Sequence, residues 1–491
     1  MTDIVLINPG ARKEIYQDLG NDLTAVEPPL WCRLIGGYLR DRDIEFEIID
    51  AEAECYGPKA LANCIAKINP KLVCMVAYGH QPSASTQQMV GAGAGCKSIK
   101  SLKNAPPILI VGGHVSALPE QTLKEEAVDY VCVGEGVITI VALYEQILEG
   151  KLELDTVPGL VWMNSSGQII QNPRANLVQD LDKDLHGNVW DMLPMKRYRA
   201  HNWQCFGALE ERQPYASIYT SLGCPFRCSF CCINAPFEVN RYRMRKPGSV
   251  VSEIQMLNKK YGIKTFKIID EMFVLNYRHV TAICEGITAL KEELNFWAYA
   301  RVDTVKTEFL GMLRKAGIRW LALGIESGST HVRDGAEKSF DTKEIKSIVR
   351  DIQSEGIHVI GNFIFGLPDD DESSMRQTLD LAKELNCEFA NFYSAMAYPG
   401  SSLYHTAKQM NWPLPKSWGG YSQHSFDCLP LPTEKLSSEK VLGFRDEAFH
   451  EYFENPRYLG MLAQRFGWDT RKHVEQMAKT RLRRKLLHPV S

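Results

Sequence analysis

Residues 214–408 alternate short apolar runs with amphipathic stretches, and this alternation constrains the fold more than any other feature of the chain. The apolar runs predict strands at 217–222, 265–270, 296–301, 320–325, 359–365 and 391–397. The stretches between them predict helices at 249–260, 278–292, 308–316, 342–355 and 373–385. Repeated strand–helix units form parallel sheets, and we expect these repeats to curl into an open barrel with its site at the carboxyl ends of the strands.

Three cysteines follow the first of these strands. Cys224, Cys228 and Cys231 are separated by three and then two residues. Thiolates are the ligands that iron–sulfur clusters need, and one short loop can carry three of them. Cys232 directly follows Cys231, and adjacent side chains point in different directions, so it is a poor fourth ligand. We therefore expect a cluster held by three cysteines, with one iron left open.

Two other uses of these cysteines fit the sequence less well. A disulfide framework is not expected, because 14 cysteines in 491 residues is a modest enrichment and no secretory segment precedes them. A zinc site would need a fourth Cys or His at a matching spacing, and the sequence supplies none there. The spacing favours an iron–sulfur cluster.

Length and charge narrow the class of protein. A chain of 491 residues predicts two or three domains. A net charge of −3 gives no general attraction to nucleic acid or anionic membrane, and the apolar runs are shorter than the ~20 residues of a membrane span. The first seven residues lead into a strand without a basic segment or cleavage site, so we expect a cytoplasmic protein.

Residues 1–150 show a second strand–helix alternation. Strands are predicted at 4–7, 45–50, 72–77, 108–111 and 130–133, which indicates a doubly wound parallel sheet. Ligands of such sheets bind beyond the carboxyl ends of the strands. The last two strands end in Gly112-Gly113 and Gly134-Glu135-Gly136, where a large flat or phosphorylated ligand could approach the backbone closely. The same glycines could equally be tight turns.

The three-cysteine motif, with Phe230 before its last cysteine, resembles the signature of radical S-adenosylmethionine (SAM) enzymes. The resemblance implies a 4Fe–4S cluster on Cys224, Cys228 and Cys231, whose open iron binds the amino and carboxylate groups of SAM. One electron then cleaves SAM to methionine and a 5′-deoxyadenosyl radical. The expected fold is α/β, with a Rossmann-like domain before a partial, TIM-like barrel of six strand–helix units.

Candidate SAM contacts follow the other predicted strands of the barrel. SAM carries an ammonium, a sulfonium and a carboxylate, so its site needs both carboxylate acceptors and an arginine donor. The resemblance implies SAM contacts at Phe230, Asp270, Glu271, Arg301, Asp303, Gly324, Glu326, Ser327, Gly361 and Gly366. Single residues have ordinary alternatives, such as a helix cap for Asp270 or a surface ion pair for Glu326.

The N-terminal strand ends resemble the cobalamin-binding domain that precedes the barrel in one large subclass. The matching segments are 112–120 and 133–136. The resemblance implies cobalamin contacts at Tyr78, His80, Ser83, Ser85, Gly112, Gly113, His114, Ser116, Gly134, Glu135 and Gly136. The Asp-x-His-x-x-Gly signature is absent after Asp50, so the position below cobalt is open or filled from elsewhere. His80 and His114 could fill it or be hydrogen-bonding turn residues, and some members keep this fold without cobalamin.

These patterns divide the chain into four parts. We expect a cobalamin-binding-like domain at 1–150, a connector with a small hairpin at 151–213, the radical SAM barrel at 214–408 and a helical C-terminal cap at 409–491. The basic segment 481–485 is expected to be a solvated helix face. Four residues of the cap could contact substrate or pack in the core: Trp418, Tyr421, His424 and Tyr452.

The function implied by the resemblance is methyl transfer. The chain resembles class B radical SAM methyltransferases and the anaerobic Mg-protoporphyrin monomethyl ester cyclase group. An enzyme of this kind would methylate an unactivated carbon of a small molecule, with electrons from a reductase such as flavodoxin or ferredoxin. A radical and its methyl donor need near-contact, so the two sites should face each other across the domain boundary. The alternatives are a radical SAM cyclase, dehydratase or epimerase, and a non-catalytic iron–sulfur electron carrier or sensor.

Overall fold

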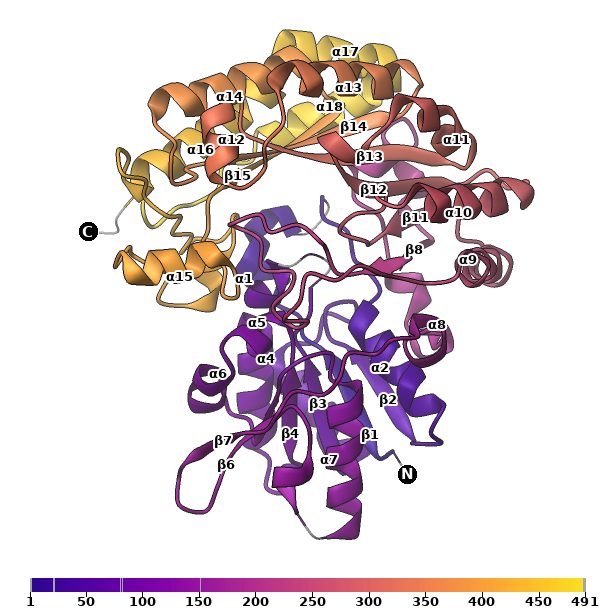
Figure 1. The fold of residues 1–491 in the computed structure, drawn as a ribbon, viewed down its shortest axis with the longest axis vertical. Coiled ribbons are helices and arrows are strands. Elements are labelled where there is room, and N and C mark those ends of the chain that lie inside the picture. Colours follow the sequence, from indigo (N-terminus) through magenta and orange to yellow (C-terminus); the bar gives the residue numbers. More distant parts are fainter. Residues whose placement is uncertain (1, 21–22, 80, 82, 151, 489–491) are drawn as a thin grey trace.

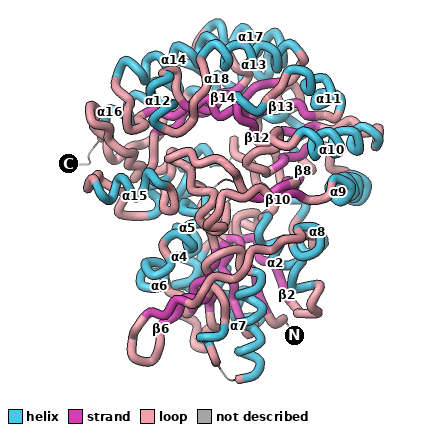
Figure 2. The backbone as a smooth tube through the Cα atoms, in the orientation of Figure 1, coloured by secondary structure: helices cyan, strands magenta, loops and turns pink. Residues whose placement is uncertain are grey.

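The computed structural model describes residues 2–20, 23–79, 81, 83–150 and 152–488. An N-terminal sheet with its helices lies below a curved second sheet that carries helices on its outer side (Figure 1). Many of the long loops lie between the two sheets (Figure 2). The overall class is the α/β organisation that the alternation predicts.

The N-terminal sheet has five parallel strands in the order β2-β1-β3-β4-β5. Their bounds are Ile4–Asn8 (β1), Phe46–Asp50 (β2), Leu72–Val76 (β3), Ile108–Val111 (β4) and Tyr130–Cys132 (β5). The main helices around them are Leu30–Arg40 (α2), Pro58–Ile68 (α3), Ala84–Lys100 (α4) and Val137–Glu149 (α7), with the short helices Gly113–Ala117 (α5) and Pro119–Glu125 (α6) at one edge. Strands β1, β3 and β4 are buried throughout, as expected for parallel strands with both faces covered.

The hairpin predicted in the connector extends this first sheet. Its strands are Leu160–Met163 (β6) and Ile169–Gln171 (β7), and β6 pairs antiparallel with β5. The sheet therefore contains two antiparallel strands at one edge, in addition to the five parallel strands that the sequence predicts.

The second sheet is a six-stranded parallel half-barrel in the order β15-β14-β13-β12-β11-β8. Its strands are Tyr215–Ile218 (β8), Thr265–Ile268 (β11), Asn295–Arg301 (β12), Ile318–Glu326 (β13), His358–Phe365 (β14) and Phe389–Ser394 (β15). The helices between them are Pro247–Tyr261 (α9), Tyr277–Ala289 (α10), Leu310–Lys315 (α11), Thr330–Gly335 (α12), Thr342–Ser354 (α13) and Glu372–Leu385 (α14). The sheet is open because β8 and β15 are its edges, which confirms the predicted partial barrel.

The first barrel strand is shorter than predicted. The chain leaves the sheet after Ile218, and Ser221–Leu222 (β9) pairs instead with Arg243–Met244 (β10). Asp270 causes this bend, since its carboxylate accepts hydrogen bonds from the Thr220 amide and the Ser221 hydroxyl. Gly223 completes the turn at φ +85°, where a Cβ would lie 2.2 Å from the Arg241 carbonyl oxygen. The cysteine loop begins at this turn.

The C-terminal part contains the helical cap that the sequence predicts at 409–491. Its helices are Ser438–Phe453 (α16), Pro456–Phe466 (α17) and Trp468–Ala478 (α18), and the helix Ser402–Gln409 (α15), which was not predicted, precedes them. The segment 481–485 is not helical. Arg481, Arg483 and Lys485 are exposed, as expected for a solvated segment, whereas Arg484 is buried and its guanidinium pairs with Asp446 at 2.8 Å. None of the helices in the described part of the chain combines the length and apolar character needed to cross a bilayer.

Candidate active site

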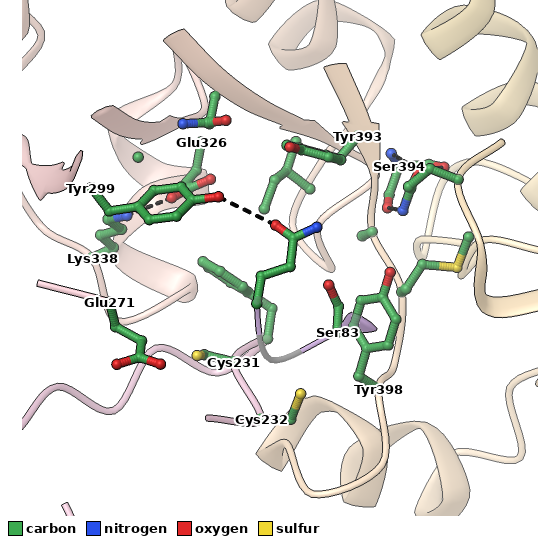
Figure 3. Close-up of a pocket in the computed structure, with 18 of the residues that line it drawn as sticks. Ser83, Cys231, Cys232, Glu271, Tyr299, Glu326, Lys338, Tyr393, Ser394 and Tyr398 are labelled. Carbon is green, nitrogen blue, oxygen red and sulfur yellow. Dashed lines mark hydrogen bonds and ion pairs between the residues drawn. The ribbon is translucent and has the colours of Figure 1, made fainter. Parts of the chain in front are cut away.

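A cavity of about 290 Å³ lies between the two sheets (Figure 3). Its walls come from the carboxyl ends of β12–β15, the cysteine loop, the loop after β3 and the segment after η9 (Trp418–Tyr421). Six predicted SAM-site or cluster residues line it: Phe230, Cys231, Glu271, Arg301, Gly324 and Glu326. Residues predicted at these strand ends therefore do line one cavity, although not every predicted residue reaches it.

The cysteine loop forms one margin of the cavity. Cys224 is buried, and Cys228 and Cys231 are half-buried. Burial raises the pKa of the Cys224 thiol to about 11 and that of Cys231 well above its usual range. A bound metal reverses this effect, because thiolate is the ligand form. Nη1 of Arg301 donates to the Cys228 sulfur at 3.5 Å.

The cysteines suit a cluster better than a single ion. Among the described residues, no three His, Cys, Asp or Glu side chains converge on a point that could hold one metal ion. The thiolates of a cluster bind separate irons and need no such convergence. All 14 cysteines are free thiols, so a disulfide framework is excluded. Cys232 also lies on the cavity wall beside Cys231 (Figure 3).

Arg301 occupies the end of β12. Its Nε and Nη2 donate to the two carboxylate oxygens of Asp303, both at 2.9 Å. Its guanidinium also lies 3.9 Å from the ring centroid of Phe226 in the cysteine loop. Arg301 thus links the strand end to the cluster loop, and Asp303 acts on the cavity through Arg301 rather than by lining it.

A buried ion pair lies at the end of β13. Glu326, which has a φ of +64°, pairs with Lys338, and both side chains are less than one-tenth exposed. A Cβ at Gly324 would lie 2.4 Å from the Lys338 Nζ, so glycine makes room for the pair. Lys338 was not predicted because it comes from the segment after α12, where no strand end marks it.

The two acidic residues after β11 have different surroundings. Asp270 is buried and accepts hydrogen bonds from Thr220 and Ser221, and it does not line the cavity. Glu271 does line the cavity, and burial raises the pKa of its carboxyl group to about 8. The structure therefore places Glu271, and not Asp270, where it could meet a ligand.

Three predicted residues point away from the cavity. The Ser327 hydroxyl lies 3.1 Å from that of Thr378, and a Cβ at Gly366 would meet Val441 at 2.5 Å. Gly361 faces Cys387, whereas its neighbour Asn362 lines the cavity. Successive side chains of β14 point to opposite faces of the sheet, so Gly361 and Asn362 face opposite ways. A glycine in the sequence does not show which face it occupies. The further lining residues that the sequence did not predict include Tyr16, Gln87, Tyr299, Tyr393, Tyr398 and Gln423.

The carboxyl edge of the N-terminal sheet carries the predicted glycines. A Cβ at Gly112 would lie 2.4 Å from the Ala77 carbonyl oxygen, so the backbone there is closely packed. Gly113 instead faces Ser85, with Pro236 next nearest, and Gly134 faces Pro236, which follows the cysteine loop. The Ser116 hydroxyl donates to the Gly112 carbonyl at 2.8 Å and accepts from the Gly134 amide at 3.0 Å. Ser116 therefore holds the two glycine loops together.

A narrow gap of about 50 Å³ lies above this edge. Tyr78, Ser85 and Gly113 form one wall, and Pro236 and Phe237 form the other. The gap shares Gln81, Cys232 and Glu271 with the larger cavity. Ser83 lines the larger cavity itself.

Two residues of the predicted cobalamin set have structural roles. Glu135 pairs with Arg243 at 2.7 Å and accepts from the Val178 amide at 2.8 Å. Gly136 precedes α7 at φ +90°, where a Cβ would lie 3.0 Å from Val111. Neither lines the gap or the larger cavity, and both instead fix the loop after β5.

The candidate histidines are placed differently from one another. His114 is buried outside both spaces, where Nδ1 forms a 3.1 Å hydrogen bond with Thr86 and the ring contacts Trp418 edge-on. Burial lowers the pKa of His114 to about 3. His80 lies outside the described residues. His424 lines the larger cavity, whereas the Tyr452 hydroxyl donates to the Cys387 carbonyl inside the barrel core.

Two family models match the parts of the chain that form this site. The model of the B12 binding domain matches residues 16–144, which include most of the N-terminal sheet. The model of the Radical SAM superfamily matches residues 218–382, which include the three cysteines and five barrel strand ends. The chain therefore carries a B12-binding domain followed by a radical SAM domain.

Two curated relatives align with most of the length of this chain. An uncharacterized methyltransferase of Pyrococcus horikoshii is 27% identical over 457 residues, or 93% of each chain. The anaerobic magnesium-protoporphyrin IX monomethyl ester cyclase of Rubrivivax gelatinosus is 25% identical over 79% of this chain and 68% of its own. The structure of the radical SAM methyltransferase TsrM from Kitasatospora setae, with cobalamin and a [4Fe-4S] cluster bound, superposes with a TM-score of 0.66 at 18% identity. It covers 98% of this chain and 99% of its own, and shows that the two-domain fold is shared.

The two domains imply a 4Fe–4S cluster, SAM and cobalamin as cofactors, and the residues present fit them. Cys224, Cys228 and Cys231 would supply thiolates from a loop whose Cys231 lines the cavity, and the cavity would offer both carboxylates and cations to SAM. The glycine edge of the N-terminal sheet offers open backbone at Gly113 and Gly134 to a flat ligand. His114 does not reach this edge, which leaves no described histidine there to ligate cobalt from below.

Proposed function

We propose that this enzyme is a cobalamin-dependent radical SAM methyltransferase that methylates an unactivated carbon of a small molecule. One observation carries the proposal: the cysteine loop, the charged barrel edge and the loop after β3 of the B12-binding domain line a single cavity. When bound, the cluster and SAM supply a 5′-deoxyadenosyl radical, and cobalamin supplies a methyl group. These chemistries must meet at near-contact distance, which a shared cavity permits.

The chain's own residues have three tasks in this proposal. Cys224, Cys228 and Cys231 hold the cluster at the cavity margin. Glu271 accepts from the amino group of SAM, and the Lys338 ammonium faces its carboxylate while remaining paired with Glu326. Because Glu326 and Lys338 are buried, the charges of this pair interact strongly and are kept from water.

The N-terminal edge has a different task, which is to hold a flat cofactor without charge. Tyr78 donates its hydroxyl proton to the Gly134 carbonyl at 2.7 Å, and so fixes the loop that borders the gap. Gly113 lets the backbone approach the cofactor closely, and Ser83 and Ser85 place hydroxyl groups near it. We propose that these five residues, with Ser116 behind them, hold cobalamin.

The test is an isotope experiment on the reconstituted holoenzyme. Methyl-labelled SAM is supplied with a strong reductant and a small-molecule extract of the host cell, and products are followed by mass spectrometry. The proposal expects 5′-deoxyadenosine together with a labelled product. Deoxyadenosine without label in any product would exclude methyl transfer.

The second candidate is a radical SAM cyclase, because a cyclase is among the relatives that span most of the chain. It predicts the unlabelled outcome just described, with a product that has lost hydrogen. We further propose that a small electron carrier of the flavodoxin or ferredoxin type reduces the cluster in the cytoplasm. Rates with reduced flavodoxin compared with dithionite would test that part.

A further inference from the structure

A second chamber adjoins the reaction cavity inside the barrel. It measures about 190 Å³ and lies among the N-terminal segment, the strands β12–β15 and the C-terminal helices α16 and α18. Five residues line both spaces and form the boundary between them, which we call the polar ring: Tyr16, Gln81, Tyr299, Tyr393 and His424.

The polar ring carries no net charge. The Tyr299 hydroxyl donates to the Gln81 side-chain oxygen at 3.4 Å, and the rings of Tyr16 and His424 lie 5.4 Å apart. His424 is neutral because burial, together with the nearby Arg445 and Arg484, lowers its pKa to about 3. The ring can therefore offer hydrogen bonds to a ligand but no ion pair.

Behind the polar ring the walls are mainly apolar and aromatic. Trp203 packs edge-on against Trp297 at 5.1 Å and parallel to His201 at 5.3 Å. Arg445 is the charged side chain among the lining residues, and its charge is already engaged by Asp446 at 2.8 Å and the Phe392 carbonyl oxygen at 2.8 Å.

The strand register explains why there is space in this place. Tyr299, Ala322, Ile360 and Phe389 are register partners on four consecutive strands, and all four line the chamber. Layers of side chains normally fill the interior of a barrel. In this layer the small side chain of Ala322 lies between larger ones, and the layer is left hollow.

The number of charged side chains thus falls from the reaction cavity to the polar ring and the second chamber, and the walls of that chamber also include the neutral polar residues Thr24, Asn202 and Asn391. The reaction cavity has ionisable side chains, the polar ring has neutral hydrogen-bonding groups, and the second chamber has aromatic walls. Burying an unpaired charge in such a chamber would cost several kcal/mol, whereas a flat apolar group gains contact with the aromatic faces.

We infer that the second chamber binds an uncharged, apolar, ring-bearing part of the substrate, while the carbon that reacts stays in the larger cavity beside the cysteine loop. This inference rests on the proposed function for the identity of the larger cavity as the reaction site. It adds a substrate class: molecules with an aromatic or similarly flat apolar moiety joined to the reacting portion. The polar ring would bind the hydrogen-bonding groups between the two.

The test uses indole as the probe of the chamber, with the holoenzyme and equilibrium dialysis. Wild-type enzyme should bind indole, and indole-3-acetate should bind about tenfold more weakly or worse because it brings a charge. Ala322→Leu fills the hollow layer and should weaken indole binding by about tenfold. Equal binding of indole by wild type and a folded Ala322→Leu variant, equal binding of the charged analogue, or no binding of indole would overturn the inference.

A second variant keeps the test valid if Ala322→Leu does not fold. Leu23 lines the chamber, whereas Leu209 is a similarly half-buried leucine against the same core that does not. Leu23→Ala should weaken indole binding several-fold, and Leu209→Ala should not. Equal effects of the two would contradict the inference. Wild-type SAM cleavage is measured in parallel: cleavage without indole binding rejects only the chamber, and indole binding without cleavage rejects only the proposed function.

Discussion

The two sheets of this enzyme end in the same way but carry different side chains at those ends. Both are parallel, and both direct loops at their carboxyl ends toward the space between them. The N-terminal edge lines that space with glycines, hydroxyls and Tyr78. The barrel edge lines it with thiols, Glu271, Arg301 and the Glu326–Lys338 pair.

We infer from this difference that the strands would fix where a ligand lies and the residues after them would fix which ligand it is. A flat, mostly neutral macrocycle suits an edge where the backbone is accessible. A small zwitterion with a sulfonium suits an edge where opposite charges are buried together. Four predictions test whether the two edges are as different as they look.

The largest effect is expected at the cysteine loop. Cys228→Ala should remove the cluster, its visible absorbance and all SAM cleavage, since the remaining thiolates cannot hold three irons. Cys232→Ala is the matched control one residue beyond the motif, and it should keep most of the iron. Iron analysis and the absorption spectrum after anaerobic reconstitution measure both. An intact cluster in Cys228→Ala would refute the ligand assignment.

The buried pair of the barrel edge comes next. Lys338→Ala leaves Glu326 buried without a partner and should cost about 3–5 kcal/mol of the free energy of unfolding. Arg243→Ala breaks the similarly buried pair with Glu135, which lies outside the cavity. Urea unfolding should show similar losses of the free energy of unfolding in the two variants. Equilibrium dialysis should show weaker SAM binding in Lys338→Ala and unchanged SAM binding in Arg243→Ala. Equal SAM affinity in the two folded variants would mean that the barrel edge does not use this charge.

A pH experiment distinguishes Glu271 from an ordinary surface carboxylate. Its folded pKa of about 8 lies above the unfolded value, so the folded chain holds a proton that the unfolded chain has lost at neutral pH. This group therefore lowers the stability of the cofactor-free protein as pH rises from about 5 to about 8. Relative to wild type, Glu271→Gln should gain about 2 kcal/mol of the free energy of unfolding across that pH range. This is less than the full pKa shift would give, because the side chain is partly exposed. A pH-independent difference in urea unfolding would count against the buried carboxylate.

The smallest effect is expected at His114, on the neutral edge. His114→Ala should lower the free energy of unfolding by about 1 kcal/mol, because the hydrogen bond with Thr86 and the contact with Trp418 are lost. The absorption spectrum of bound hydroxocobalamin should not change, because the ring lies outside both spaces. A spectral shift in the variant would show that this edge ligates cobalt after all.

Much of this difference between the edges could be read from the sequence. The alternation of apolar runs predicted all the parallel strands, and the cysteine spacing predicted the loop at the cavity margin. The strand ends predicted Glu271, Arg301 and Glu326, because residues there must lie near the site in a parallel barrel.

The errors have physical causes that sequence alone does not show. Asp270 and Glu271 are adjacent carboxylates, and only tertiary contacts with Thr220 and Ser221 decide which one is structural. Gly361 was predicted to line the site and its neighbour Asn362 was not, because a glycine in the sequence does not show which face of the strand it occupies. Lys338 and Gln423 reach the cavity from segments outside the strand ends.

The metal content of one preparation tests the central claim most directly. The chain is reconstituted anaerobically with iron, sulfide and hydroxocobalamin, passed through a desalting column, and assayed for iron and cobalt. If the barrel edge holds the cluster and the N-terminal edge holds cobalamin, about four iron atoms and about one cobalt atom are expected per chain. Iron at that level with no retained cobalt would contradict the account of the N-terminal edge, and loss of both metals would contradict the account of the whole site.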